Sequence, residues 1–166
     1  MYHGARFTVT TKPLRQTEIP PVESKLLDDG TLFLDFGKDA FGSLLLPSGE
    51  GATNAVTVHL GEQLAPNGRL EREPAGCIRC IRVIQSLDRD HPRTRVEIPP
   101  DERNTGPAAI LMPKDIGEVI PFRYAEIEDA KDIDPDECRQ VRVHYQFNDD
   151  ASAFDSSDDV LNAVWD

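Results

Sequence analysis

Two cysteines in the stretch CIRC, Cys77 and Cys80, have the C-x-x-C spacing that zinc and redox sites use. A structural zinc ion takes four ligands, and the sequence has no second pair of ligands at a suitable spacing. If the segment is a strand, the two thiols also point to opposite faces. We therefore predict no metal site here and interpret both cysteines as small strand residues.

A second candidate for metal binding is the acidic run DAKDIDPDE (129–137). Asp132, Asp134 and Asp136 have the D-x-D-x-D spacing that begins a calcium loop. The run lacks the glycine of loop position six, and Val143 stands where the bidentate glutamate belongs. We interpret residues 129–140 as a solvated acidic linker and leave calcium binding as an open alternative.

The residues that could serve hydrolysis are not marked by their context. The sequence has no G-x-S-x-G elbow, and His144 falls on the polar face of an expected strand. Pairs of acids such as Glu71 with Glu73 or Glu126 with Glu128 have the pattern of exposed charges in strands and turns. We predict no catalytic residue, no cofactor and no metal, and the substrate-binding residues stay unknown.

Composition and charge narrow the class of protein. The chain has 166 residues, 39% of them hydrophobic and 29% charged, which suits one globular domain with a short extension. The net charge is -12, and residues 126–166 carry thirteen acids against three basic residues. Such a field repels phosphate backbones and anionic lipids, so we expect no nucleic-acid and no membrane partner.

The start of the chain lacks the apolar core of a signal peptide, and the three cysteines cannot all pair with one another. These features favour a reducing, cytoplasmic location.

The elements that must position these residues are short apolar runs bounded by Gly, Pro, Asn and Asp. They predict an all-β fold, an antiparallel β-sandwich of the jelly-roll, galactose-binding-like kind with a short C-terminal helix. In the last expected strand, alternation places Val141, Val143, Tyr145 and Phe147 on one buried face. The expected strands are 31–36, 42–46, 55–60, 80–87, 94–98, 108–112, 122–128 and 141–147.

The chain closes with FDSSDDVLNAVWD (154–166), which has the pattern of a helix start. Ser156 or Ser157 can cap the helix, and an apolar stripe that includes Leu161 and Trp165 lies on one side. A helix of about ten residues is marginal alone in water, so it needs a surface to pack against.

Four stretches in order resemble bacterial α-L-rhamnosidases and their glycoside-hydrolase relatives over about residues 31–166. They are LFLDFGKDAFGSLLL (32–46), VTVHLGEQLAPNGRL (56–70), VIPFRYAEIE (119–128) and FDSSDDVLNAVWD (154–166). The resemblance implies the β-sandwich that precedes the catalytic domain. It further implies that the last stretch enters a catalytic α/α barrel. That barrel would carry the two carboxylates of an inverting hydrolase beyond Asp166, so no position here inherits a catalytic role.

From the resemblance we predict three parts, 1–128 as the sandwich, 129–140 as the linker and 141–166 as the last strand and the helix start. The expected function is a non-catalytic accessory sandwich that braces the barrel, in cis or in trans, and that could also contact a rhamnose-containing glycan. The expected domain-interface residues are Phe154, Leu161, Val164 and Trp165. Two alternatives stay open, a stand-alone carbohydrate-binding module and an interaction protein that assembles through its terminal helix.

Overall fold

The structure is a computed structural model that describes residues 13–48, 55–88, 90–109, 111–147 and 153–165. The chain divides into two compact units, residues 15–144 and residues 1–14 with 145–166. The elements are, in chain order, β1 (Leu14–Ile19), β2 (Glu23–Leu26), β3 (Leu32–Pro47), β4 (Ala55–Gly61), β5 (Cys80–Ser86), β6 (Arg93–Arg95), η1 (Glu102–Asn104), β7 (Ile120–Glu128), η2 (Pro135–Glu137), β8 (Arg139–Tyr145) and α1 (Asp159–Trp165).

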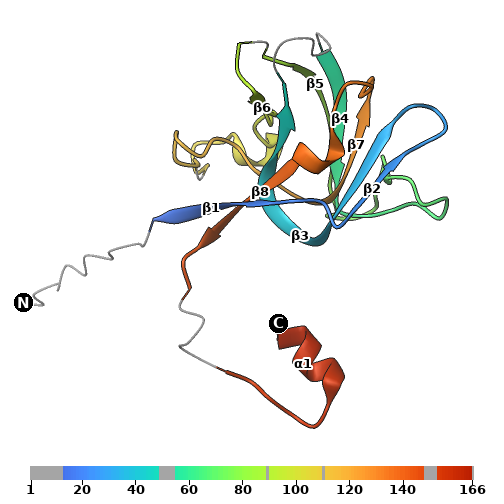
Figure 1. Cartoon of the computed structure of the whole chain (residues 1–166). Coiled ribbons are helices and arrows are strands. Elements are labelled where there is room, and N and C mark those ends of the chain that lie inside the picture. Colours follow the sequence, from blue (N-terminus) through green and yellow to red (C-terminus); the bar gives the residue numbers. More distant parts are fainter. Residues whose placement is uncertain (1–12, 49–54, 89, 110, 148–152, 166) are drawn as a thin grey trace, which may run out of the picture. The chain divides into compact units, whose positions relative to one another are not determined.

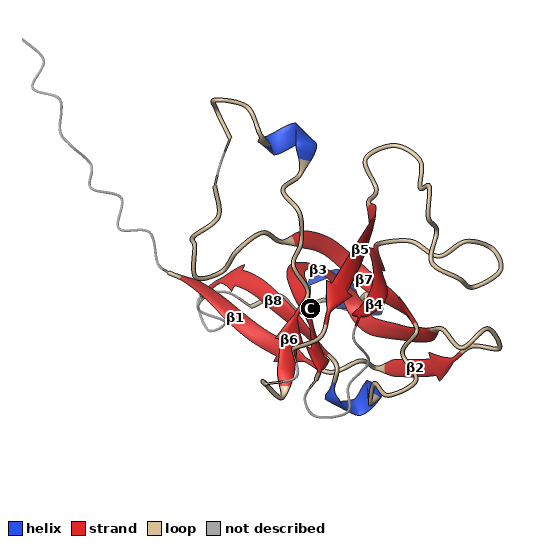
Figure 2. Cartoon of the chain, turned by 90° about the horizontal axis from the view of Figure 1, so that it is seen from above, coloured by secondary structure: helices blue, strands red, loops and turns tan. Residues whose placement is uncertain are grey.

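The eight strands form one mostly antiparallel sheet with the order β1-β8-β3-β7-β4-β5, and β2 and β6 also pair with β3 (Figure 1). β3 is sixteen residues long and belongs to both halves of this sheet. Its first part pairs with β2 and β7, and its last part pairs with β8 and β6. The sheet curves around β3, and its strands enclose a common core (Figure 2). This arrangement confirms the predicted all-β sandwich.

The two expected strands 31–36 and 42–46 are parts of the single strand β3. The pairing with β7 shifts register between Asp35 and Ala40, where β3 bulges. Gly37 supplies the positive φ of 78° that this bulge requires, and its amide donates to the Asp35 carboxylate. The glycines therefore bend one continuous strand, and β7 runs alongside both sides of the bend.

The core consists of apolar side chains that alternate inward along the strands. Phe36 and Phe122 pack edge to face, with ring centroids 5.8 Å apart. Burying one such side chain stabilises the fold by about 1.5–3 kcal/mol. The largest fully buried apolar side chains are Phe36, Phe122, Leu34, Leu44, Leu46, Leu60, Ile127, Val56, Val58 and Val96.

Several expected strand boundaries differ from the structure. Residues 108–112 hold no strand in their described part, and the prolines at 107 and 113 that flank them cannot donate to a ladder. β8 begins two residues earlier than expected, and its apolar face is buried only at Val141. Tyr145 and Phe147 are exposed, so the expected buried face of this strand was wrong in its second half.

The acidic stretch 129–140 packs against the sandwich. Ala130, Ile133 and Cys138 belong to the core. Asp134 caps η2 by accepting a hydrogen bond from the Asp136 amide at 2.9 Å. The stretch therefore differs from the expected solvated linker, because its apolar residues point inward while its acids face solvent.

The C-terminal helix forms where the sequence predicts it, but with another cap. Asp158 Oδ1 accepts hydrogen bonds from the amides of Val160 and Leu161, whereas Ser156 exchanges hydrogen bonds with Asn162. The prediction of a serine cap was therefore wrong. No helix of the described residues is long and apolar enough to cross a membrane.

Candidate functional site

One row of side chains crosses five neighbouring strands on the face of the sheet that points away from the core. The register joins Lys25, Phe33, Glu126, His59 and Arg82 in that order, from β2 to β5. Residues directly opposite in antiparallel strands point to the same face, so these five share one surface. Four of the five side chains of this outer row are titratable, Lys25, Glu126, His59 and Arg82.

Glu126 lies at the centre of the outer row and is fully buried. Its carboxylate accepts four hydrogen bonds, from Arg69 Nε at 2.8 Å, Arg69 Nη2 at 3.1 Å, the Leu70 amide at 2.9 Å and Arg72 Nη2. We name Glu126 and its two arginines, Arg69 and Arg72, the Glu126 clamp.

Burial alone would raise the pKa of Glu126, but the hydrogen bonds from Arg69 and Leu70 and the positive charge of Arg72 hold it below its ordinary value. Glu126 therefore stays ionised at neutral pH. Its oxygens are occupied, so it acts as an anchor and is unsuited to acid–base catalysis.

A tight turn in the loop between β4 and β5 presents Arg69 to the clamp. Gly68, with a φ of 78°, donates to the Ala65 carbonyl, and the Asn67 side chain accepts from the Arg69 amide. Leu70 then packs beside Gly61, where an added Cβ would lie 2.9 Å from a Leu70 methyl carbon. The loop thus lies over Glu126 and excludes water from it.

The family-like motifs of the sequence contact one another in the fold. Asp35 of DFG forms a two-bond ion pair with Arg123 of PFRY, at 2.8 Å for each bond. The guanidinium of PFRY thus finds its acidic partner in DFG. The same two motifs join through the Phe36–Phe122 contact, while Tyr124 stacks on Phe33 of the outer row instead of entering the core. The motifs therefore build the sandwich.

Two other acids near the outer row have different environments. Glu128 accepts a hydrogen bond from His59 Nε2 at 2.9 Å, and its side chain is 44% exposed. Burial raises the pKa of Glu62, even though its carboxylate accepts from the Arg79 amide at 2.7 Å. The prediction that Glu126 and Glu128 are ordinary exposed charges holds for Glu128 and was wrong for Glu126. No signal in the sequence marks the burial of Glu126, because its alternation with the apolar residues of β7 indicates only that it faces outward.

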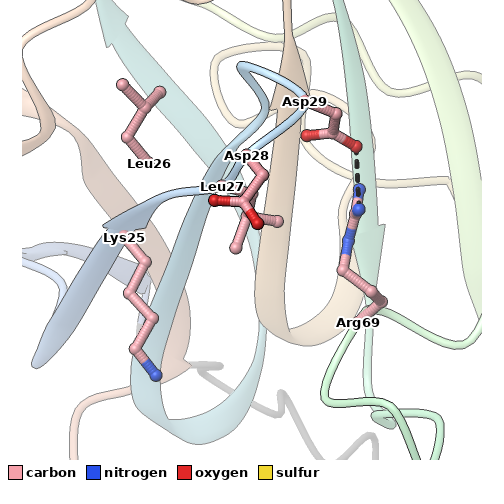
Figure 3. A pocket seen from close by; sticks show the side chains of 6 residues that line it. All are labelled: Lys25, Leu26, Leu27, Asp28, Asp29 and Arg69. Atoms are coloured by element: carbon pink, nitrogen blue, oxygen red, sulfur yellow. Dashed lines mark hydrogen bonds and ion pairs between the residues drawn. The ribbon is translucent and has the colours of Figure 1, made fainter.

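A hollow of about 450 Å³ opens at the end of the outer row (Figure 3). Its walls are the turn after β2 and the Arg69 side chain, and Asp29 joins them by a hydrogen bond from Arg69 Nη1 at 2.8 Å. The Thr31 amide and Arg69 together lower the pKa of Asp29 to about 2. The lining residues are Lys25, Leu26, Leu27, Asp28, Asp29 and Arg69.

The cysteines and acids considered for metal binding or redox chemistry lie in separate environments. Cys77 is exposed and Cys80 is half-buried, and burial raises the pKa of the Cys80 thiol. Asp134 and Asp136 serve η2 as described above. In the described parts of the chain, no three His, Cys, Asp or Glu side chains form a group that could hold a metal ion. His144 is exposed and lies 3.0 Å from the Thr17 hydroxyl.

The expected domain-interface residues belong to the unit that contains α1. Val160, Leu161 and Val164 are exposed on this helix, at 72%, 52% and 79%, and Phe154 before it is 43% exposed. The side chain of Trp165 lies outside the described residues. That these side chains form an interface stays a prediction.

Comparison with known proteins gives a structural likeness but no sequence family. No protein-family model matches the chain, and no curated protein gives a significant match. The chain is similar in structure to an α-L-rhamnosidase from Streptomyces avermitilis, solved in complex with L-rhamnose. The TM-score is 0.54 and the identity is 18%.

The likeness covers 82% of this chain and 12% of the rhamnosidase chain. At this identity it shows the fold alone. The sandwich described here therefore has the fold of a small part of that enzyme.

Proposed function

We propose that this chain is the non-catalytic β-sandwich of an α-L-rhamnosidase-like glycoside hydrolase and that it braces a catalytic helical barrel. The observation that carries the proposal is the mutual packing of the motifs that resemble this family. Asp35 with Arg123, and Phe36 with Phe122, hold the sandwich together through those motifs. The structural likeness to a part of a rhamnosidase supports the same assignment.

The state of the buried acids supports a role without catalysis. Among the described residues, the buried carboxylates are Asp35 and Glu126, and each is held by arginine. The bond from Arg123 lowers the pKa of Asp35 against the effect of burial, as the clamp does for Glu126. A glycosidase needs one carboxyl group that is protonated at neutral pH, and neither of these is suited to that role.

The exposed apolar side chains of α1 support a contact with a further domain. A seven-residue helix has few hydrogen bonds of its own and gains stability from packing. We propose that Leu161 and Val164 face the catalytic barrel, with Phe154 and Trp165 beside them. Acids before and within the first turn of α1 favour the positive end of its dipole.

Two assays test the proposal. The purified chain alone should not hydrolyse an aryl α-L-rhamnoside. Antibodies against the chain should deplete aryl-rhamnosidase activity from extracts of the cells that make it. Robust turnover by the chain alone would refute the non-catalytic role, and undiminished activity in a fully depleted extract would refute the link to a rhamnosidase.

A further inference from the structure

We propose that the hollow beside the outer row is a binding site for an uncharged, hydroxyl-rich ligand, such as one sugar unit. The site lies between the turn after β2 and the Arg69 side chain (Figure 3). The proposal does not depend on the bracing role, because it is argued from the side chains that line the hollow.

Two of the lining side chains, Arg69 and Asp29, are held in place without a ligand. Arg69 is held by two bonds to Glu126 and one to Asp29. Asp29 is held in turn by the Thr31 amide at 3.0 Å, and Gly30 closes the turn by donating to the Leu27 carbonyl at 2.8 Å. These two side chains therefore lose little conformational entropy when a ligand binds.

The hydrogen-bonding groups that Asp28 and Arg69 leave free in the hollow, a carboxylate acceptor and N–H donors, suit the hydroxyl groups of a ligand. The carboxylate of Asp28 has no hydrogen-bond partner within the described part of the chain and lies between Lys25 and Asp29 in Figure 3. Arg69 has five N–H groups, of which its three bonds leave two as donors. A hydroxyl both donates and accepts, so two neighbouring hydroxyls can bind Asp28 and Arg69 together.

The charges of the hollow disfavour an ionic ligand. Asp29 is already paired with Arg69, and Lys25 is paired with Glu23 at 2.6 Å. An anion would approach the carboxylate of Asp28, and a cation would approach the ammonium of Lys25. A neutral ligand avoids both repulsions.

The apolar surface and the volume of the hollow also suit a sugar ring. Leu26 is 71% exposed, and with Leu27 it offers a surface for the C–H groups of a sugar ring. The volume of about 450 Å³ lies at the low end of ligand sites, which run from roughly 300 to 1,000 Å³, and suits one small ligand.

Backbone amide NMR of the intact chain tests the site. The probes are the methyl glycosides of glucose, galactose, mannose and a 6-deoxyhexose, added one at a time. At least one should shift the amides of residues 25–29 and of Arg69 in a saturable way, with a dissociation constant on the order of 1 mM. The absence of saturable shifts at these residues with all four probes would overturn the proposal.

A pair of variants links binding to the proposed group. Asp28→Asn should weaken binding about tenfold, because a charged acceptor is lost. Asp115→Asn removes the same charge from an exposed loop residue outside the hollow and should leave binding unchanged. Equal affinities of the folded Asp28→Asn and Asp115→Asn proteins would overturn the proposal. If Asp28→Asn fails to fold, Leu26→Ser provides the second variant and should weaken binding through the apolar wall.

The sugar-binding test and the test of the bracing role can fail independently of each other. A chain that binds no sugar can still deplete rhamnosidase activity with its antibody, and a chain that binds sugar can fail to do so.

Discussion

Replacing Glu126 by glutamine tests the Glu126 clamp directly. The substitution keeps the shape of the side chain but removes the charge that Arg69 and Arg72 share. Removing one partner of a buried ion pair costs roughly 3–5 kcal/mol. Both arginine side chains are 34% exposed, so water can solvate part of their charge. We therefore expect a loss of about 3 kcal/mol in the free energy of unfolding, the low end of that range.

Glu128→Gln is the matched control. It lies on the same strand and the same face, two residues from Glu126, and its side chain is 44% exposed. Its partner is His59, and because water reaches the half-exposed carboxylate, losing this single hydrogen bond should cost only about 1 kcal/mol. The two variants make the same chemical change, so the difference between them isolates the burial of the clamp.

The assay is urea unfolding followed by circular dichroism of the β-sheet. Tryptophan fluorescence is unsuitable, because the single tryptophan, Trp165, lies outside the unit 15–144. With a slope of about 2 kcal/mol per M, Glu126→Gln should lower the urea midpoint by about 1.5 M. A midpoint equal to that of Glu128→Gln would refute the assignment of Glu126 as the anchor of the loop.

The same variant predicts a pH dependence. The folded pKa of Glu126 lies below its ordinary value of 4.5, so the charge stabilises the fold above that pH. This contribution is lost as the pH falls through the folded pKa. The difference in stability between wild type and Glu126→Gln should therefore shrink in acid, and a difference that grows in acid would contradict the sign.

Three further substitutions, two of them with a control variant, test other parts of the chain. Gly42→Ala would place a Cβ 2.3 Å from a carbonyl oxygen of β8 and should destabilise the sandwich by about 3 kcal/mol. Gly106→Ala meets no atom within 4 Å, and its urea midpoint should stay near that of wild type. Asp35→Asn should cost about 2 kcal/mol in the same urea assay, because its guanidinium partner loses a charged acceptor; an unchanged midpoint would show that this pair is not stabilising. Leu161→Asp should abolish the depletion of rhamnosidase activity by an antibody against the chain, without changing the urea midpoint of the chain. Ala163→Asp on the same helix is the control and should retain this depletion. Equal depletion with both variants would exclude Leu161 from the interface.

The fold class could be predicted from the sequence because apolar alternation reports which face of a strand is buried. Strands without such alternation were not predicted. β1 and β2 are edge strands with exposed side chains, so their sequences carry no burial pattern. The bulge of β3 was predicted as a break between two strands, because the glycines of a bend resemble those of a turn.

The outer site could not be predicted because it depends on partners distant in sequence. Glu126 becomes buried only when Arg69, 57 residues away, closes over it. Period-two alternation marks Glu126 as outward-facing, which is correct, but it cannot show that a loop covers that face. The pairing of Arg123 with Asp35 likewise depends on the register of β3 and β7, which the sequence does not show.

The central position of β3 has a consequence for how the chain folds during synthesis. The short turn after β2 lets the β2–β3 hairpin form early, because its contacts are local. The last part of β3 pairs with β8, about a hundred residues later in the chain. Until β8 has left the ribosome, that edge of β3 stays open to unwanted pairing with other strands. Folding of this domain is therefore expected to be slow and late, and a chain cut before Arg139 should aggregate.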